Sequence, residues 1–561
     1  MFASIVTANP NSDRPIPCPQ TRHRRVRSFQ DKVAAGACLQ EIRRIVESPR
    51  PNGFRSALNS PCHQAGQNQS RNPTQSSYPN TAPNTACHGS PYEQVACHIK
   101  IKLTTGPPAP AHVRAQQHSD SPGAARTASL AAMSTPAPLK LACIGCGARA
   151  QTYTQLAARR PEQFQIVAGA DPVPERIEKI RRTAAHGSFR GFPSAEAILA
   201  AGKLADVLIV ATQDNSHFEH CRGALQLGYD VLLEKPIATS AAQVLEIQRL
   251  ARLANKRVMV CFVLRFAAFY QKAKEILDSG ALGELVSIQA NEGVNPWHQA
   301  HSFVRGHWSV VDRSSPMILS KCCHDTDIVH WLAGRSCTRV ASFGSLEFFR
   351  PERAPAGAPP RCTDGCPVGE TCPYNALRYT TDLRFPWLPM VYDRAQEATA
   401  EEIVAWLRTS PWGRCVYRCD NDAVDRQVLA LEFAGGVTGT FTMTAFATGR
   451  HLEICGTKGV LKGGESYRQH FGTHLVLLPH EGPPVRYSVQ AEDGGYELHG
   501  GGDAGLVNAL YDEMTKPPGS TLAAGLDSTV HSHLIAFAAE EARLTGRVID
   551  LRAFERTHAP A

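Results

Sequence analysis

The chain has 561 residues, of which 43% are hydrophobic and 20% charged, as in an ordinary folded protein large enough for two or three domains. It has no uninterrupted apolar run of about 18 residues, so we expect no transmembrane helix and no membrane partner. The formal net charge is +8, but residues 1–132 hold 15 Lys and Arg against 6 Asp and Glu, which leaves the remainder nearly neutral. This distribution argues against a nucleic-acid partner for the folded part.

Residues 1–132 are rich in Pro, Ser, Asn and Gln and show no sustained hydrophobic periodicity. Such a segment buries too little apolar surface to offset its chain entropy, so we expect it to be disordered or not to be part of the native protein. It lacks the apolar region of a secretory signal. The basic stretch at residues 22–27 could be a nuclear or mitochondrial address, but Met133 would make a natural start. A chain that begins there is expected to fold unchanged.

A glycine-rich turn follows the first predicted strand. Residues 139–144 are an apolar run with strand character, and GCGARA at residues 145–150 leads from it into a helical pattern. This is the dinucleotide-binding fingerprint in the context that it requires. Gly145 and Gly147 would permit a tight turn and a close approach to a pyrophosphate, and the small Ala150 would let the helix pack against the strand.

The second predicted strand, at residues 164–170, ends at Asp171, near the offset at which an acidic residue holds the adenosine ribose. Because a carboxylate there would repel a 2′-phosphate, we expect NAD rather than NADP. The pattern continues with strands at 205–211, 229–233 and 257–263 and helices at 218–227 and 241–254. This alternation predicts an α/β domain with a doubly wound parallel sheet, a Rossmann domain, over residues 133–262.

The fourth of these strands, at residues 229–233, leads into Glu234-Lys235-Pro236, and ATQDNSHFEHCRGALQLGYDVLLEKP resembles the Gfo/Idh/MocA oxidoreductases. The resemblance extends from about residue 140 to about residue 551. It implies a Rossmann domain followed by an α+β domain, with Lys235 beside the nicotinamide and the substrate. A lysine at the carboxyl end of a parallel strand also points, on physical grounds, into the crevice where ligands bind.

The resemblance places three further side chains with the cofactor, namely Thr212, His217 and Glu234. His217 lies in the sequence DNSH, where the family approaches the nicotinamide. It could instead cap the helix that follows, although Asn215 or Ser216 is the better candidate for a cap.

The pattern changes after residue 263. A helix is expected at 269–277 and a strand at 285–290, and later strands at 428–433, 437–445, 451–454, 460–461 and 474–478 are joined by Gly-rich turns. They predict an α+β domain with a large open antiparallel sheet over residues 263–551, with a Cys- and Pro-rich insertion at 350–420 and a tail at 552–561. Within the insertion, the Pro- and Gly-rich residues 352–376 have no obvious core. In the family, the exposed face of this sheet often makes a dimer contact, so we expect a homodimer or homotetramer.

The chemical centre of the second half is SPMILSKCCHDTDIVHWLAG, at residues 315–334. A proline suits the first turn of a helix and a glycine its C-terminal stop, so we predict one helix across this segment. Lys321, His324 and Asp327 are spaced three apart and would share one face of that helix. We therefore expect all three in the catalytic group.

The resembled family carries a helix in which a histidine is followed three residues later by an aspartate, and His324 and Asp327 match this pair. The resemblance implies that His324 contacts the substrate hydroxyl. Four residues before the histidine, the family often has a carboxylate, but this chain has Ser320. The chain departs from the family at this position, where it has no carboxylate to tune His324.

The loop before this segment contains His298, His301 and Arg305, which are candidate substrate contacts. Arg305 could hold a carboxylate or phosphate with two parallel hydrogen bonds, or could pair with an acidic residue nearby.

Three cysteines in the insertion have a metal-like spacing: Cys362, Cys366 and Cys372. With Cys415 or Cys419 as a fourth ligand they predict a structural zinc, and free thiols are the alternative. We expect no catalytic metal, because the resembled chemistry needs none. Other cysteines fall within apolar core patterns, and without a secretory signal they favour a reducing compartment, the cytoplasm.

These features predict an NAD-dependent oxidoreductase that transfers hydride between NAD and a hydroxyl or carbonyl carbon of a sugar, polyol or cyclitol. The substrate hydroxyl would lie between Lys235 and His324. We expect His324, with a near-neutral pKa, to take the proton while Lys235 stabilises the developing negative charge. Alternatively, Lys321 lowers the pKa of Lys235 by repulsion and Lys235 is the base.

Two other functions remain open. One is an enzyme that retains NAD and cleaves a glycosidic bond through transient oxidation. The other is a non-catalytic dinucleotide-binding regulator, and the presence of both Lys235 and His324 argues against it.

Overall fold

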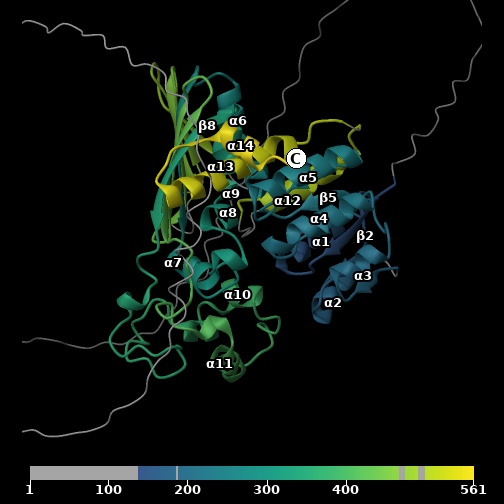
Figure 1. Ribbon diagram of the computed structural model, residues 1–561, viewed down its shortest axis with the longest axis vertical. Coiled ribbons are helices and arrows are strands. Elements are labelled where there is room, and N and C mark those ends of the chain that lie inside the picture. Colours follow the sequence, from purple (N-terminus) through teal and green to yellow (C-terminus); the bar gives the residue numbers. More distant parts are fainter. Residues whose placement is uncertain (1–136, 185–187, 466–473, 490–498, 518, 561) are drawn as a thin grey trace, which may run out of the picture. The chain divides into compact units, whose positions relative to one another are not determined.

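The computed structural model describes residues 137–184, 188–465, 474–489, 499–517 and 519–560 (Figure 1). All of them belong to the unit formed by residues 125–561. The prediction of a disordered segment at residues 1–132 therefore lies outside the described residues. Within the described part of the chain, no helix combines the length and the apolar character that a membrane span requires.

Six parallel strands form the first sheet in the order β3-β2-β1-β4-β5-β6, so the predicted doubly wound sheet is confirmed. Its strands are β1 (Leu139–Ile144), β2 (Phe164–Ala170), β3 (Arg190–Phe192), β4 (Val207–Val210), β5 (Asp230–Leu233) and β6 (Val258–Val260). The connecting helices are α1 (Ala148–Ala158), α2 (Pro174–Thr183), α3 (Ala195–Ala200), α4 (His217–Gln226) and α5 (Ala241–Ala254). Chain order reverses between β1 and β4, the switch point where such sheets bind ligands.

A helix from the far end of the chain completes this domain. Leu506, Val507 and Leu510 of α12 (Gly502–Thr515) are buried in the same apolar cluster as Leu141 and Cys143 of β1. Helix α12 therefore packs on the Rossmann sheet, although it lies within residues 263–551 of the sequence. Hydrophobic periodicity shows that a helix has an apolar stripe, but it does not show which sheet that stripe covers.

Nine strands form the second sheet in the order β14-β13-β12-β11-β7-β10-β9-β8-β15. They are β7 (Leu285–Val294), β8 (Cys337–Ser345), β9 (Arg426–Phe433), β10 (Thr438–Thr444), β11 (Thr448–Gly456), β12 (Gly459–Glu465), β13 (His474–Pro479), β14 (Val485–Ser488) and β15 (Ile549–Asp550). The pairing is antiparallel as expected, except that β7 and β10 run parallel. Strands β7 and β10 are far apart in sequence, so no hairpin requires them to be antiparallel.

Helices cover one face of the second sheet (Figure 1). They are α6 (Ala268–Asp278), α9 (Cys323–Ala333), α13 (Leu526–Thr545) and α14 (Leu551–His558). Side chains of β9 and β10 alternate between buried and exposed, as in a sheet with one open face. Phe343 and Val428, directly opposite each other on β8 and β9, are 70% and 40% exposed. A tail was expected at residues 552–561, but α14 continues to His558 and buries Phe554.

The insertion between β8 and β9 consists of short helices and turns, including α10 (Arg384–Trp387) and α11 (Ala400–Thr409). It has two small apolar clusters, one around Tyr379 and Leu407 and the other around Phe349 and Tyr374. Residues 352–376, which were expected to have no obvious core, contribute Ala358, Tyr374 and Ala376 to these clusters. Aromatic side chains scattered along a Pro- and Gly-rich sequence meet in space without helical or strand periodicity.

Candidate active site

The glycine-rich turn between β1 and α1 has the geometry that a pyrophosphate needs. Gly145 has φ +83°, and a Cβ atom there would lie 2.5 Å from the carbonyl oxygen of Ala211, so only glycine fits. Gly147 is the N-cap of α1 without a side-chain cap, and a Cβ atom on it would meet no neighbouring group within 4 Å. Ala150 is fully buried in the first turn. These residues fit a dinucleotide whose phosphates approach the N-terminus of α1.

Asp171 lies beside this turn, at the end of β2. Its Oδ2 atom accepts a 2.8 Å hydrogen bond from the Cys146 N–H, and its Oδ1 atom accepts a 2.9 Å bond from the Val173 N–H. Each carboxylate oxygen has a second lone pair, so these bonds orient the group while leaving it able to accept from ribose hydroxyls.

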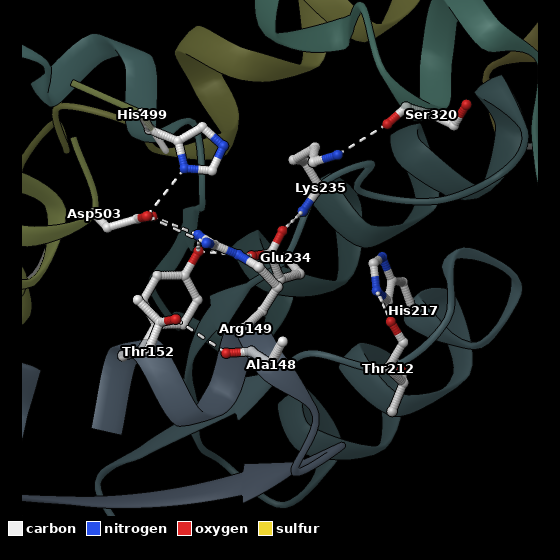
Figure 2. A network of polar contacts seen from close by, with 11 residues as sticks. Ala148, Arg149, Thr152, Thr212, His217, Glu234, Lys235, Ser320, His499 and Asp503 are labelled. Carbon is white, nitrogen blue, oxygen red and sulfur yellow. Dashed lines mark hydrogen bonds and ion pairs between the residues drawn. The ribbon is translucent and has the colours of Figure 1, made fainter. Parts of the chain in front are cut away.

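A chain of ionic contacts connects α1 with the E-K-P turn and with α12. The Nε atom of Arg149 lies 2.8 Å from Oε1 of Glu234, and its Nη2 atom lies 2.5 Å from Oδ1 of Asp503. Figure 2 shows Arg149 between these two carboxylates. The other Glu234 oxygen accepts a 3.0 Å hydrogen bond from the Lys235 N–H. Glu234, which was predicted to contact the cofactor, therefore holds the backbone that carries Lys235.

His217 connects the end of β4 to the same turn. Its Nδ1 atom lies 2.6 Å from the carbonyl oxygen of Pro236. Its Nε2 atom lies 3.1 Å from the carbonyl oxygen of Thr212, a contact that Figure 2 shows. Ser216 occupies the N-cap position of α4, as one of the two candidates for it, but makes no side-chain cap hydrogen bond. Ser216 belongs to a short 3₁₀ turn and has helical backbone angles rather than the extended ones of a side-chain cap.

Lys235 extends from the end of β5 toward the second domain. Its Nζ atom donates a 2.9 Å hydrogen bond to the carbonyl oxygen of Ser320 (Figure 2). Ser320 ends α8 (Met317–Ser320), four residues before His324. The lysine of the Rossmann sheet and the segment that carries His324 therefore meet.

The segment predicted as one helix is two. Helix α8 ends at Ser320 and α9 begins at Cys323, with Lys321 and Cys322 between them. His324 and Asp327 share α9, but Lys321 does not, so the prediction that all three lie on one helix face was wrong. The break presents the Ser320 carbonyl to Lys235, a contact over 85 positions that local periodicity does not show.

His324 is buried in the first turn of α9. Its ring packs edge-on against Phe262, with centroids 5.8 Å apart, and lies 6.0 Å from the ring of His499. Burial, with the positive charge of Lys235 next in effect, lowers the pKa of His324 well below its ordinary value. The expected near-neutral pKa was therefore wrong. The neutral imidazole that results can accept a proton.

Asp327 faces the body of the protein. Arg265 binds its carboxylate with two hydrogen bonds of 2.6 and 2.7 Å, and the Ser532 hydroxyl donates a third of 2.9 Å. Arg265 and Asp327 are 3% and 1% exposed. These contacts make Asp327 a brace between α9 and α13 rather than a group that faces the reacting atoms.

Lys321 belongs to a cluster of buried charges on the second sheet. Its Nζ atom lies 3.2 Å from Glu292, whose other carboxylate oxygen lies 2.9 Å from Nε of Arg450. The same Nε atom lies 2.7 Å from Asp325. Burial raises the pKa of Asp325 to about 6 against the opposing effect of Arg450.

The three loop residues predicted to contact substrate do not stay together. His298 faces the charge cluster: after burial, the positive charge of Lys321 contributes most to lowering its pKa well below the ordinary value. His301 is 3% exposed and hydrogen-bonds through Nδ1 to the Tyr379 hydroxyl in the insertion. Arg305 is 1% exposed. It precedes the insertion in sequence, but its side chain lines a cavity formed mainly by residues of the insertion. Of the three, only His298 has the surroundings of a substrate contact.

His499 was missed by the sequence reasoning. Its Nδ1 atom lies 3.0 Å from Oδ2 of Asp503, so the Arg149 network continues to the imidazole next to His324 (Figure 2). Burial lowers the pKa of His499 although Asp503 opposes this effect. His499 and Asp503 are four positions apart near the start of α12, and this spacing is the local signal from which their contact could have been predicted.

The predicted zinc ligands Cys362, Cys366 and Cys372 line a small cavity inside the insertion. Among the described residues, no group of three or more His, Cys, Asp or Glu side chains is arranged so that it could hold a metal ion.

Comparison with known proteins gives the same division of the chain. A family model described as the NAD-binding Rossmann fold of the GFO/IDH/MocA oxidoreductase family matches residues 139–262. The C-terminal alpha/beta domain of the same family matches residues 274–481. Together the two matches cover more than half of the chain.

Among individual proteins, the chain is 25% identical over 317 residues to YteT of Bacillus subtilis, which is named as an oxidoreductase; the match covers 54% of this chain and 72% of YteT. It is 30% identical over 177 residues to an inositol 2-dehydrogenase of Streptomyces avermitilis, covering 31% of this chain and 48% of that enzyme.

Solved structures share the fold. An oxidoreductase from Agrobacterium radiobacter in complex with NAD+, L-tartaric acid and magnesium superposes with a TM-score of 0.52 at 17% identity, covering 74% of this chain and 99% of that one. The aldose-aldose oxidoreductase of Caulobacter crescentus, complexed with glycerol, superposes with a TM-score of 0.50 at 15% identity, with the same coverage.

Proposed function

Because this chain belongs to the Gfo/Idh/MocA family of NAD-binding oxidoreductases, which act on CH–OH groups, we propose that it oxidises one secondary hydroxyl of a sugar or cyclitol. The observation that carries the proposal is the meeting of Lys235, from β5, with the segment that leads into His324. NAD, when bound, supplies the hydride acceptor. The chain's own residues must then orient the hydroxyl and take its proton.

His324 is the base in this proposal. Burial and nearby positive charges keep its imidazole neutral, so it can accept the hydroxyl proton as the carbon gives up its hydride. Lys235 donates a hydrogen bond to the same oxygen and stabilises its developing negative charge. In the described structure the Lys235 ammonium donates to the Ser320 carbonyl, which fixes its direction before substrate arrives.

The charge cluster supports a polyhydroxylated substrate. Lys321 and Arg450 are donors and Glu292 and Asp325 are acceptors, which together can bind neighbouring hydroxyls that both donate and accept. Inositol 2-dehydrogenases among the relatives act on such a molecule by name. We therefore place a cyclitol or a sugar ring against this cluster, with His298 at its edge.

We propose NAD as the preferred cofactor. Asp171 is held beside the glycine-rich turn by two backbone N–H groups, and its negative charge would repel a 2′-phosphate. Replacing Asp171 with Ser should relax the preference toward NADP, which the ratio of kcat/KM for the two cofactors measures. A wild-type enzyme that already prefers NADP would remove this assignment.

The open face of the second sheet is our proposed homodimer or homotetramer contact, because it exposes Phe343 and Val428 side by side. We propose the cytoplasm as the compartment, since none of the thirteen cysteines of the described residues forms a disulfide. The zinc predicted in the insertion takes no part in the proposed reaction.

The test is a screen of cyclitols and sugars for NAD reduction by the purified protein, followed at the absorbance of NADH. We expect sustained turnover with one of them and none with the matching deoxy compound, which lacks the reacting hydroxyl. Cofactor that stays bound and returns to NAD after each turnover would instead support the glycosidase-like alternative.

A further inference from the structure

Four thiols from two separate segments surround one cavity in the insertion. Cys362, Cys366 and Cys372 come from a single loop, and Cys415 comes from the strand-like segment about 40 residues later. Their cavity measures about 20 Å³, which is space for one or two water-sized atoms. An organic ligand does not fit such a space, but a single metal ion does.

Cys415, and not Cys419, is the fourth member of this group. Cys415 lines the cavity and is 8% exposed. The Sγ atom of Cys419 is directed elsewhere and donates to the carbonyl oxygen of Cys415 at 3.3 Å. The two candidates that the sequence left open are therefore distinguished by position.

A buried cation lines the same cavity. Arg305 donates from Nε to the Arg414 carbonyl at 2.7 Å and from Nη2 to the Tyr374 carbonyl at 2.6 Å, and its Nη2 atom lies 3.7 Å from the sulfur of Cys362. Its Nη1 atom is buried without a hydrogen-bond partner. A buried guanidinium group without a carboxylate partner is costly unless another negative charge compensates it.

We propose that Cys362, Cys366, Cys372 and Cys415 bind one structural zinc ion and that Arg305 compensates the charge of the site. Four thiolates and Zn²⁺ carry a net charge of −2, and the guanidinium N–H groups can donate to the sulfur atoms. In the described structure the thiols do not converge on one point, so rotation about χ1 must turn them into the cavity when the ion binds.

The site would add a cross-link between segments that already pair. The Cys415 N–H donates to the Pro360 carbonyl, and the Cys362 N–H donates to the Gly413 carbonyl. Arg305, which follows the π-helix Gln299–Val304, donates to the Arg414 and Tyr374 carbonyls and so connects both segments to the loop that carries His298. Zinc would therefore reinforce the part of the insertion on which that loop packs.

Metal analysis of the full-length protein, purified without chelator, tests the proposal. We expect about one zinc per chain in the wild type. A mercurial that reacts with thiols should release that zinc in step with the modification of about four cysteines, which a metal-sensitive dye follows. Zinc-free protein, or iron with acid-labile sulfide in place of zinc, would overturn the proposal.

Two matched variants in one loop assign the fourth ligand. Cys415→Ser should reduce the zinc content to about a tenth or less, whereas Cys419→Ser should retain it. Wild-type protein loaded with Co²⁺ should show the near-ultraviolet absorption of thiolate–cobalt bonds. This measurement does not depend on whether a variant folds. Equal zinc in both variants, or loss in Cys419→Ser alone, would contradict the assignment of Cys415.

Discussion

At the scale of single residues, the surroundings of His324 decide where its protonation occurs. Burial and the charge of Lys235 favour the neutral imidazole, so its pKa lies well below the ordinary value. A general base works above its pKa and fails below it. The kcat/KM for oxidation should therefore stay constant as the pH falls through about 6.5, the ordinary pKa of histidine, and decline only at more acidic pH.

A pH–rate profile with the best substrate of the screen checks this expectation. The acidic limb should be absent from the residual activity of His324→Gln, which cannot titrate. An acidic limb centred at pH 7 or above in the wild type would show that another group is the base.

Lys235 is the second residue whose role can be isolated. Its Nζ atom donates to one backbone carbonyl, so Lys235→Ala should change stability and NAD affinity little. It should lower kcat about 10²-fold or more, the usual effect of removing a positioned group in the transition state. The double variant with His324→Ala should be little worse than either single one, because both act on one hydroxyl.

Steady-state rates and a fluorescence titration with NAD separate these effects. Lys458→Ala, which removes an exposed lysine between β11 and β12, serves as the control and should behave as wild type. Near-normal turnover by Lys235→Ala would leave the protein as a dinucleotide binder without the proposed mechanism.

At the scale of elements, α9 owes its position to a buried ion pair. Removing one partner of such a pair leaves the other charge buried, which costs roughly 3–5 kcal/mol. Asp327→Asn should therefore lower the free energy of unfolding by about that amount, because Arg265 and Asp327 are almost completely buried. Urea unfolding followed by circular dichroism measures the change.

An exposed pair provides the comparison. Arg252 and Asp527 lie 2.6 Å apart but are 66% and 72% exposed, so Asp527→Asn should cost about 1 kcal/mol or less. If the two variants lose equal stability, the buried pair is not a brace. Replacing both Arg265 and Asp327 with apolar residues should recover part of the loss.

The elements themselves were largely predictable from the sequence, because their signals are local. Alternating strands and helices gave the Rossmann sheet, and the glycine fingerprint gave the turn before α1. The partners of the site residues were not predictable in this way. Arg149 meets Asp503 across 354 positions, and Lys235 meets Ser320 across 85. A periodic pattern identifies the buried face of a helix but not the residue that it will meet.

The same limit explains Asp327 and Lys321. Three-residue spacing correctly placed His324 and Asp327 on one helix, but it did not show that Arg265 would occupy the carboxylate. Nor did it show that the helix would break before Cys323. Both outcomes depend on contacts with η2 (Val263–Phe266) and with β5, which lie outside the window of a helical pattern.

At the scale of the whole molecule, buried neutral histidines link stability to pH. Burial lowers the pKa of His301 and His330 to about 3 and that of His533 to about 4. Below about pH 6.5 the unfolded chain binds protons at these positions while the folded chain does not, so unfolding is favoured as the pH falls. Asp325, with a pKa raised to about 6, and Asp327, whose pKa burial also raises, act in the opposite direction, but they are fewer than the histidines with lowered pKa values.

We therefore expect the Tm to fall steadily between pH 7 and pH 5, before most carboxylates titrate. Each pH unit below about 6.5 should remove up to roughly 1.4 kcal/mol per histidine that stays neutral in the folded state. Thermal unfolding at a series of pH values and constant ionic strength measures the slope. His301→Gln should reduce that slope because it removes one buried titrating group, whereas His480→Gln, at an exposed position, should leave it unchanged. A Tm that stays constant or rises from pH 7 to pH 5 would show that these imidazoles are protonated in the fold, and His324 would then lose its assignment as a neutral base.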